Sequence, residues 1–281
     1  MYEKYLNEEN EPNLFKIPVI IKTKNGDAVK LDAIVQDTKA DGTSCGTIIF
    51  SHGAPGCHRD FRRLYPYLEK ENVRVISINF PGCGYTKYDE RLENDNDERM
   101  QFVQQIIDVL NLKEKLIFIG HSRGSENSIK MAVKNSEKTV GVILVNPIGI
   151  QPHLYNKVAK LKIKSGDVCC VTTSLLAGLD YTDVLPYINK LNDSNIKNVL
   201  IYGGKDWIVQ KSISQELLDC FKDNVEIKDD GDDDITISDT LKEVKHGRKS
   251  IGVYCRNSGH FLLRDRPELI SQAILAMLKI G

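Results

Sequence analysis

Short apolar runs, separated by longer polar or amphipathic stretches, recur along the chain. The segments 16–23 (KIPVIIKT) and 29–36 (VKLDAIVQ) flank an Asn25-Gly26 pair, which readily adopts the positive φ angles of a hairpin turn. We therefore expect an antiparallel hairpin near the N-terminus. Further apolar runs are short enough to be strands buried on both faces: 46–50, 73–79, 115–119, 140–145, 199–202 and 251–255. The hairpin and these runs together predict eight strands.

Segments whose apolar residues have helical spacing lie between or after these runs. Apolar residues recur every three or four positions in ERMQFVQQIIDVLNL (98–112) and again in 269–278. Strands that alternate with such helices favour an α/β fold, here an eight-stranded, mostly parallel sheet with helices on both faces. Ligand sites in sheets of this kind lie at the carboxyl ends of the strands.

Two stretches interrupt the alternation. The first, 150–194, has no clear strand and is typical of two or three short helices inserted over the sheet. The second, 223–249, contains the tract DDGDDD; it fails the calcium-binding EF-hand pattern and favours a solvated loop. We therefore expect a core domain in two parts, 1–149 and 197–281, with a helical lid insertion at 150–196 and an acidic loop at 223–249.

Composition narrows the class of protein. The 281 residues are 41 % apolar and 27 % charged, which is typical of a globular protein with one large domain. A formal net charge of -1 gives no bulk field that attracts nucleic acid. The longest uncharged stretch, 139–156, contains prolines, glycines and polar residues, so no membrane span is expected. Seven cysteines without a CxxC pair, and an N-terminus unlike a secretory signal, favour reduced thiols in the cytoplasm.

The strongest chemical signal is Gly120-His121-Ser122-Arg123-Gly124, which matches G-x-S-x-G. Such a match arises by chance in about one chain in ten of this length, and a tight turn with an inert serine would look the same. Here it follows the apolar run LIFI and precedes a helical segment, which is the strand, turn and helix of a nucleophile elbow. Gly120 and Gly124 suit a strained turn, and Ser122 would stand at a helix N-terminus that stabilises negative charge.

With this motif in place, nearly the whole chain resembles the α/β-hydrolase fold superfamily. In that superfamily the first central strand leads into an oxyanion loop, which corresponds here to SHGAPG with His52 and Gly53. The resemblance implies two backbone N–H donors for an oxyanion, those of Ala54 and Arg123. The elbow GHSRGSEN, the segment FVQQIIDVLNL and the HGAPG loop look most like a branch of uncharacterised α/β hydrolases expanded in nematodes.

The superfamily's chain order of serine, acid and histidine implies the partners of Ser122. His260 lies in NSGHF just after the last predicted strand, where the superfamily places its base. Asp206, in YGGKDW after the penultimate predicted strand, resembles the superfamily's G-x-x-D acid. The alternative acid position holds Asn146, which cannot supply a charge. We attribute the long separation of Asp206 from His260 to the acidic segment between them.

Other residues of the two loops have plainer interpretations. We expect His52 to stabilise its own loop and His121 to pack beside the serine. Arg123 could bind an acidic substrate group, but an i, i+3 ion pair with Glu126 is favoured.

Together these features predict a serine hydrolase of the carboxylesterase or lipase type, acting on a small acyl substrate through an acyl-enzyme and using neither cofactor nor metal. Two alternatives stay open. A catalytically silent member of the fold would serve as a binding or scaffold protein, and an acyltransferase would use the same three groups with another acceptor.

Overall fold

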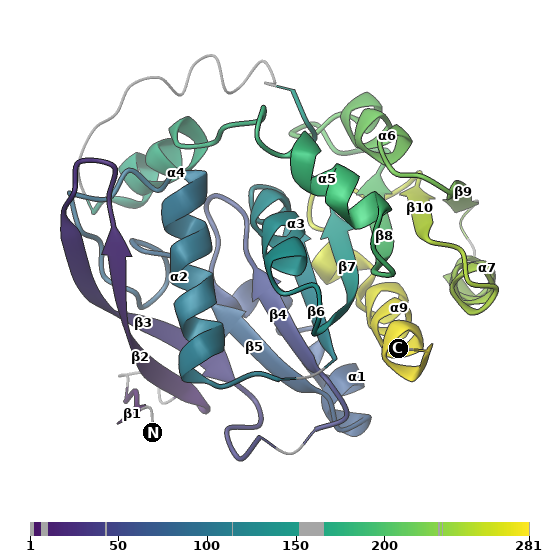
Figure 1. The fold of residues 1–281 in the computed structure, drawn as a ribbon. Coiled ribbons are helices and arrows are strands. Elements are labelled where there is room, and N and C mark those ends of the chain that lie inside the picture. Colours follow the sequence, from purple (N-terminus) through teal and green to yellow (C-terminus); the bar gives the residue numbers. More distant parts are fainter. Residues whose placement is uncertain are drawn as a thin grey trace.

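A sheet covered by helices on both faces forms the body of the protein (Figure 1). The computed structural model describes residues 3–6, 11–42, 44–113, 115–151, 166–229, 231 and 233–280. The strands are β1 (Glu3–Lys4), β2 (Leu14–Lys22), β3 (Ala28–Asp37), β4 (Thr47–Ser51), β5 (Arg74–Ile78), β6 (Leu116–His121), β7 (Thr139–Val145), β8 (Lys197–Gly203), β9 (Asn224–Asp229) and β10 (Ser250–Cys255). The helices are α1 (Tyr65–Lys70), α2 (Asn96–Val109), α3 (Gly124–Lys134), α4 (Val168–Ala177), α5 (Leu185–Asn192), α6 (Lys211–Asp219), α7 (Asp233–Lys245), α8 (Leu262–Asp265) and α9 (Pro267–Ile280), with a short 3-10 helix η1 (His58–Phe61). Within the described residues, no helix is both long and apolar enough to cross a membrane.

The sheet is antiparallel at its N-terminal edge and parallel elsewhere. Its strand order is β1-β2-β3-β5-β4-β6-β7-β8-β10-β9. β2 and β3 form the expected hairpin, in which Gly26 takes a φ of 89°. From β5 onward every neighbouring pair is parallel. The carboxyl ends of these strands therefore meet at one edge, where the loops after β4, β6, β8 and β10 come together.

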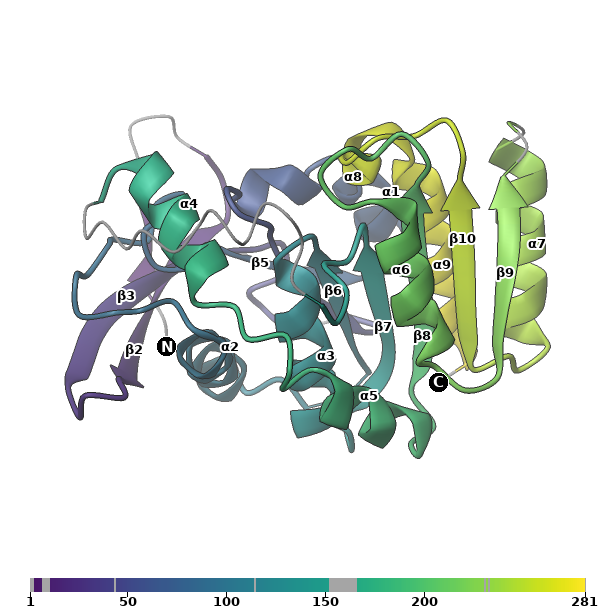
Figure 2. The same ribbon diagram turned by 90° about the horizontal axis from the view of Figure 1, so that it is seen from above.

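Both faces of the central strands are buried, which explains their continuous apolar runs. On β4, Ile49 belongs to one apolar cluster, whereas Ile48 and Phe50 belong to a second on the opposite face. Helices α2, α3, α5 and α6 cover the first cluster and α1, α7 and α9 cover the second (Figure 2). The prediction of a mostly parallel sheet covered on both faces is confirmed.

The prediction of eight strands is wrong, because the sheet of the described residues has ten. One missed strand, β1, is only two residues long. The other, β9, pairs in parallel with β10 along its whole length and forms the far edge of the sheet. Its sequence, NVEIKD, alternates apolar and polar residues because an edge strand is only partly buried, so it lacks the apolar run that identified the central strands.

The predicted acidic loop at 223–249 is also wrong, because this segment forms β9 and α7. Asp233 and Asp234 lie in the first turn of α7, where the positive end of the helix dipole stabilises carboxylates. Asp229 ends β9 and forms an ion pair with Arg266. The described part of the acidic tract therefore starts a helix and anchors a strand.

The predicted lid insertion at 150–196 contributes α4 and α5 to the described residues. Helix α5 buries Ile188 and Leu191 in the first apolar cluster, so it is a covering helix of the core. Helix α4 packs Val171 and Leu175 against Cys83, in a separate small cluster that Ala54 borders. Residues 152–165 lie outside the described residues, and the division of the chain at 149 and 196 stays a prediction.

Candidate active site

Ser122 occupies the sharp turn between β6 and α3. Its φ angle is 50°, a left-handed value that is strained for a residue with a side chain, and its N–H donates to the carbonyl of Val145 (3.0 Å). A Cβ added to Gly120 would lie 2.5 Å from the carbonyl oxygen of Gly124, and one added to Gly124 would lie 2.0 Å from that of Ser51. Neither glycine can therefore be replaced without moving a strand or the helix.

His260 and Asp206 meet at the same edge of the sheet, in the loops after β10 and β8. His260 Nδ1 lies 2.7 Å from Asp206 Oδ2, and both residues are buried. The other carboxylate oxygen accepts the N–H groups of Ile208 (2.8 Å) and Val209 (2.9 Å), which fixes the carboxylate. Because a carboxylate only accepts, His260 Nδ1 donates to it, and Nε2 of the neutral imidazole remains an acceptor.

The loop of His260 lies directly against the serine turn. His121 Nε2 is 2.9 Å from the main-chain oxygen of His260, and the two rings are 4.7 Å apart between centroids. Burial, reinforced by His260, lowers the pKa of His121 to about 4, so the ring is neutral and packs against that of His260. In the described residues the His260 ring contacts Asp206, and no direct hydrogen bond joins it to Ser122 Oγ. Such bonds often close only when substrate binds.

The SHGAPG loop after β4 lies on the other side of the serine. A Cβ added to Gly53 would lie 3.1 Å from the Cβ of Ser122, so the loop backbone approaches Ser122 closely. His52 Nε2 accepts the N–H of Phe80 (3.1 Å), and its Nδ1 therefore donates to the carbonyl of Gly53 (2.7 Å). Burial lowers the pKa of His52 to about 3, which keeps the ring neutral. His52 holds its own loop, as expected.

The Arg123 side chain is fully buried and points away from any open site. Its Nη1 pairs with Glu126 at 2.5 Å, its Nη2 donates to Asn96 Oδ1 (2.8 Å), and its Nε donates to the carbonyl of Leu175 in α4 (2.9 Å). The predicted i, i+3 ion pair is confirmed, and these contacts leave the guanidinium no room to bind an acidic substrate group. Only the main chain of Arg123 remains a candidate for binding at the site.

One residue of the site was assigned no role from the sequence. Asn146 follows β7 with a φ of 43°, and its Nδ2 donates to the carbonyls of His260 (2.8 Å) and Gly259 (3.1 Å). Its Oδ1 accepts the N–H of Gly203 at the end of β8 (2.8 Å). An asparagine directly after a buried strand, where a left-handed conformation is tolerated, is the one signal in the sequence.

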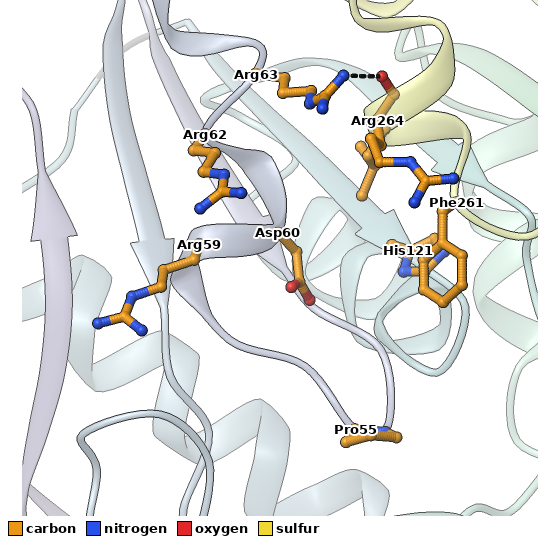
Figure 3. Close-up of a pocket in the computed structure, with 9 residues that line it drawn as sticks. Pro55, Arg59, Asp60, Arg62, Arg63, His121, Phe261 and Arg264 are labelled. Carbon is orange, nitrogen blue, oxygen red and sulfur yellow. Dashed lines mark hydrogen bonds between the residues drawn. The ribbon is translucent and has the colours of Figure 1, made fainter.

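A basic cavity of about 370 Å³ borders the serine turn (Figure 3). It is lined by Pro55, Arg59, Asp60, Arg62, Arg63, His121, Phe261, Leu263 and Arg264. Four of these nine residues are arginines and one is acidic. We call this cavity the arginine pocket.

Comparison with known proteins identifies a family and a fold. A sequence profile described as "Alpha/beta hydrolase of unknown function (DUF1057)" matches residues 11–155 and 153–279. The Caenorhabditis elegans protein "Uncharacterized protein F35H12.5" is 23 % identical over 281 aligned positions, covering 85 % of this chain and 79 % of that protein.

Two solved esterase structures are similar to this chain. The esterase EaEST from Exiguobacterium antarcticum has a TM-score of 0.64 at 14 % identity, covering 94 % of this chain and 100 % of that one. A thermophilic esterase from Thermogutta terrifontis has a TM-score of 0.67 at 15 % identity, covering 94 % and 98 %. At such identities the likeness concerns the fold alone.

Proposed function

Because the chain belongs to this family of alpha/beta hydrolases, we propose that it is a serine hydrolase that cleaves a carboxylic ester or a related acyl bond. The observation that carries the proposal is the buried His260–Asp206 pair, 2.7 Å between Nδ1 and Oδ2, in a loop that contacts the turn of Ser122. A histidine oriented by a carboxylate beside a serine is the arrangement that activates a hydroxyl as nucleophile. The esterase names of the structural neighbours point to the same reaction class.

In the proposed reaction, Ser122 Oγ attacks the acyl carbon while His260 Nε2 takes its proton. His260 then gives that proton to the leaving group, and Asp206 stabilises the imidazolium that forms between the two steps. The N–H groups of Ala54 and Arg123 bind the oxyanion, and one such donor is typically worth about 3 to 4 kcal/mol of the barrier. Water activated by His260 then hydrolyses the acyl-enzyme.

The test is covalent labelling by a fluorophosphonate probe together with turnover of a p-nitrophenyl ester. We expect the wild-type protein to be labelled at Ser122, and Ser122→Ala to lose both labelling and turnover. His260→Ala should lower kcat by at least about a thousandfold, because the hydroxyl then lacks its base. Ser136→Ala and His246→Ala, at exposed positions outside the candidate site, are the matched controls.

Circular dichroism of each variant separates lost chemistry from lost folding. A folded wild-type protein whose Ser122 stays unlabelled would overturn the proposal in favour of a binding or scaffold protein. Labelling of Ser122 without release of free acid, but with transfer to an added alcohol or amine, would favour an acyltransferase instead.

A further inference from the structure

The arginine pocket adjoins the proposed catalytic groups along the chain and in space. Three of its lining residues are the immediate sequence neighbours of groups in the proposed mechanism: Pro55 follows Ala54, His121 precedes Ser122, and Phe261 follows His260. The rings of Phe261 and His121 lie 6.4 Å apart between centroids on the same side of the pocket (Figure 3). Any group bound in the pocket would therefore lie next to the reacting ester.

The charge of the arginine pocket differs from that of the whole molecule. The chain carries a formal net charge of -1, whereas four arginines face one aspartate in the pocket. Among the described residues Asp60 forms no ion pair, and its Oδ2 accepts the N–H of Cys57 (3.1 Å). Burial raises the pKa of Asp60, because the Cys57 bond and the nearby charge of Arg62 only partly offset the loss of water.

The arginines come from two segments that only the fold brings together. Arg62 and Arg63 follow η1, Arg264 lies in α8, and Arg63 Nη1 donates to the carbonyl of Arg264 (3.2 Å) across the pocket. The Arg62 guanidinium has neither an ion pair nor a hydrogen bond within the described part of the chain. Arg59 is turned the other way, toward Glu11 (2.5 Å) and Tyr85 (2.7 Å). Arg264 Nε donates to its neighbour Asp265 (2.9 Å), and its terminal nitrogens have no further partner among the described residues. Arg62 and the terminal nitrogens of Arg264 are therefore the donors best placed for a ligand.

Guanidinium groups bind carboxylates and phosphates through paired N–H donors, so such a pocket selects an anion. In the mechanism proposed above, the leaving atom receives its proton from His260 and must lie against that ring, and Phe261 extends the same wall into the pocket. We propose that the arginine pocket binds a phosphate or carboxylate on the leaving-group side, so that the substrate is an acyl ester or thioester with an anionic leaving group. The inference rests on the proposed function.

The first test compares leaving groups of different charge. We would measure kcat/KM for 4-acetoxybenzoate, for its neutral methyl ester and for 4-acetoxyphenyl phosphate at constant ionic strength. The readout is kcat/KM for each anionic ester divided by kcat/KM for the neutral ester. This ratio is then compared between the wild type and each variant. Arg62→Gln and Arg264→Gln should each lower this ratio about fivefold, the size expected for one exposed charge pair. The anion with the larger loss identifies phosphate or carboxylate as the group bound.

Arg248→Gln is the control for the change of net charge. Arg248 is partly exposed, pairs with Asp223, and lies before β10, whereas His260 follows the other end of that strand. Its ratio should equal that of the wild type. Equal ratios in all four proteins, or an equal fall in the control, would overturn the inference while leaving the hydrolase intact.

A second test does not depend on turnover. Inorganic pyrophosphate is titrated by calorimetry into Ser122→Ala protein and into the same protein with Arg62→Gln, Arg264→Gln or Arg248→Gln. We expect one saturable site, with a dissociation constant about fivefold higher in the two pocket variants and unchanged in the control. If no ester is hydrolysed but this pattern holds, the proposed function fails and the anion pocket stands. If no saturable binding is found, or if it is insensitive to Arg62 and Arg264, the anion pocket fails.

Discussion

His260 is held at two points, its ring and its main-chain oxygen. The ring contacts Asp206, and the main-chain oxygen is bonded by Asn146 Nδ2 as well as lying next to His121 Nε2. The same asparagine accepts the N–H of Gly203, so it joins the loop of His260 to the end of β8. Asn146 touches neither the ring nor the serine hydroxyl in these contacts, and we therefore assign it a positioning role.

We expect Asn146→Ala to lower kcat for a p-nitrophenyl ester by about tenfold with a smaller change in KM, because the imidazole is less well oriented. The free energy of unfolding should fall by about 1 to 3 kcal/mol, since the buried N–H of Gly203 loses its acceptor. Steady-state kinetics and urea denaturation measure the two effects.

Asn198→Ala is the matched control, because Asn198 is a buried asparagine at the opposite end of β8, bonded to Ile196. It should lose stability without losing kcat. A wild-type kcat in Asn146→Ala, or an equal loss in the control, would refute the positioning role.

Single residues can be predicted from the sequence where their role depends on the spacing of nearby residues. The G-x-S-x-G motif singles out Ser122 as the candidate nucleophile, which stays a prediction, and the i, i+3 spacing predicts the Arg123–Glu126 pair that the structure shows. The role of Asn146 depends on partners 57 and 114 residues further along the chain, so no local pattern reveals it.

At the scale of the element, the N-terminus of α2 depends on a buried carboxyl group. Asp95 caps the helix by accepting the N–H of Glu98 (2.9 Å), and Glu98 Oε2 accepts the N–H groups of Glu93 (2.8 Å) and Asn94 (2.7 Å). Burial, followed by the charge of Asp95, raises the pKa of Glu98 to about 7. Above this pH the ionised Glu98 therefore weakens a turn that its hydrogen bonds otherwise support.

A carboxyl whose pKa is higher in the folded than in the unfolded state stabilises the fold most below the unfolded value and loses this contribution as pH rises through the folded value. The stability of the wild type should therefore fall between about pH 4.5 and pH 7 on account of Glu98. We expect Glu98→Gln to remove this part of the pH dependence. The variant should be more stable than the wild type at pH 8 by about 1 kcal/mol, and no more stable at pH 4.

Urea denaturation at a series of pH values measures this difference. Glu137→Gln, at an exposed position in the turn after α3, is the control and should leave the pH profile unchanged. A pH-independent difference between Glu98→Gln and the wild type would contradict the argument.

Elements buried on both faces are predictable from the sequence, because burial requires an unbroken apolar run. β4, β6 and β7 satisfy this, whereas β9 lies at an edge and carries polar residues. Its neighbour α7 begins within an acidic tract, and the tract alone does not distinguish a solvated loop from a favourable helix start.

At the scale of the molecule, one guanidinium connects β9, the strand at the far edge of the sheet, to the helices beside it. Arg266, between α8 and α9, pairs with Asp229 at the end of β9 and with Asp233 at the start of α7 (2.8 Å). Burial alone would raise the pKa of Asp229, but hydrogen bonds from Arg266 and from the N–H of Gly231 outweigh it and lower the pKa. Asp229 is almost fully buried, so its charge needs this partner.

We expect Asp229→Asn to lower the free energy of unfolding at pH 7 by about 2 kcal/mol, because it leaves Arg266 without its buried partner. A depressed pKa contributes stability above the unfolded value and loses it as pH falls through the folded value. The difference between wild type and variant should therefore shrink as pH falls from about 4 toward 2.

Chemical denaturation at pH 7 and at pH 3 would follow this trend. Asp233→Asn removes the more exposed partner and should cost less than about 1 kcal/mol. An Asp229→Asn protein as stable as the wild type at pH 7 would show that the edge is held by other contacts.

The alternation of strands and helices predicts the parallel, doubly covered sheet of the whole molecule. It cannot predict the arginine pocket, since Arg62 and Arg264 lie about 200 residues apart and meet only after α8 packs against η1. The boundary of the lid is equally hidden, because α5 and α4 follow one another in sequence but pack in different clusters.

The bond between Arg123 and α4 ends on a main-chain carbonyl, that of Leu175. A main-chain acceptor is present whatever side chain residue 175 carries, so the anchor tolerates substitution at that position. Mutation at this position can therefore change what α4 contributes to the small cluster with Cys83, while Arg123 keeps its acceptor and the turn of Ser122 stays tied to the helix. The support of this turn is thereby separated from the side chains of the helix that supplies it.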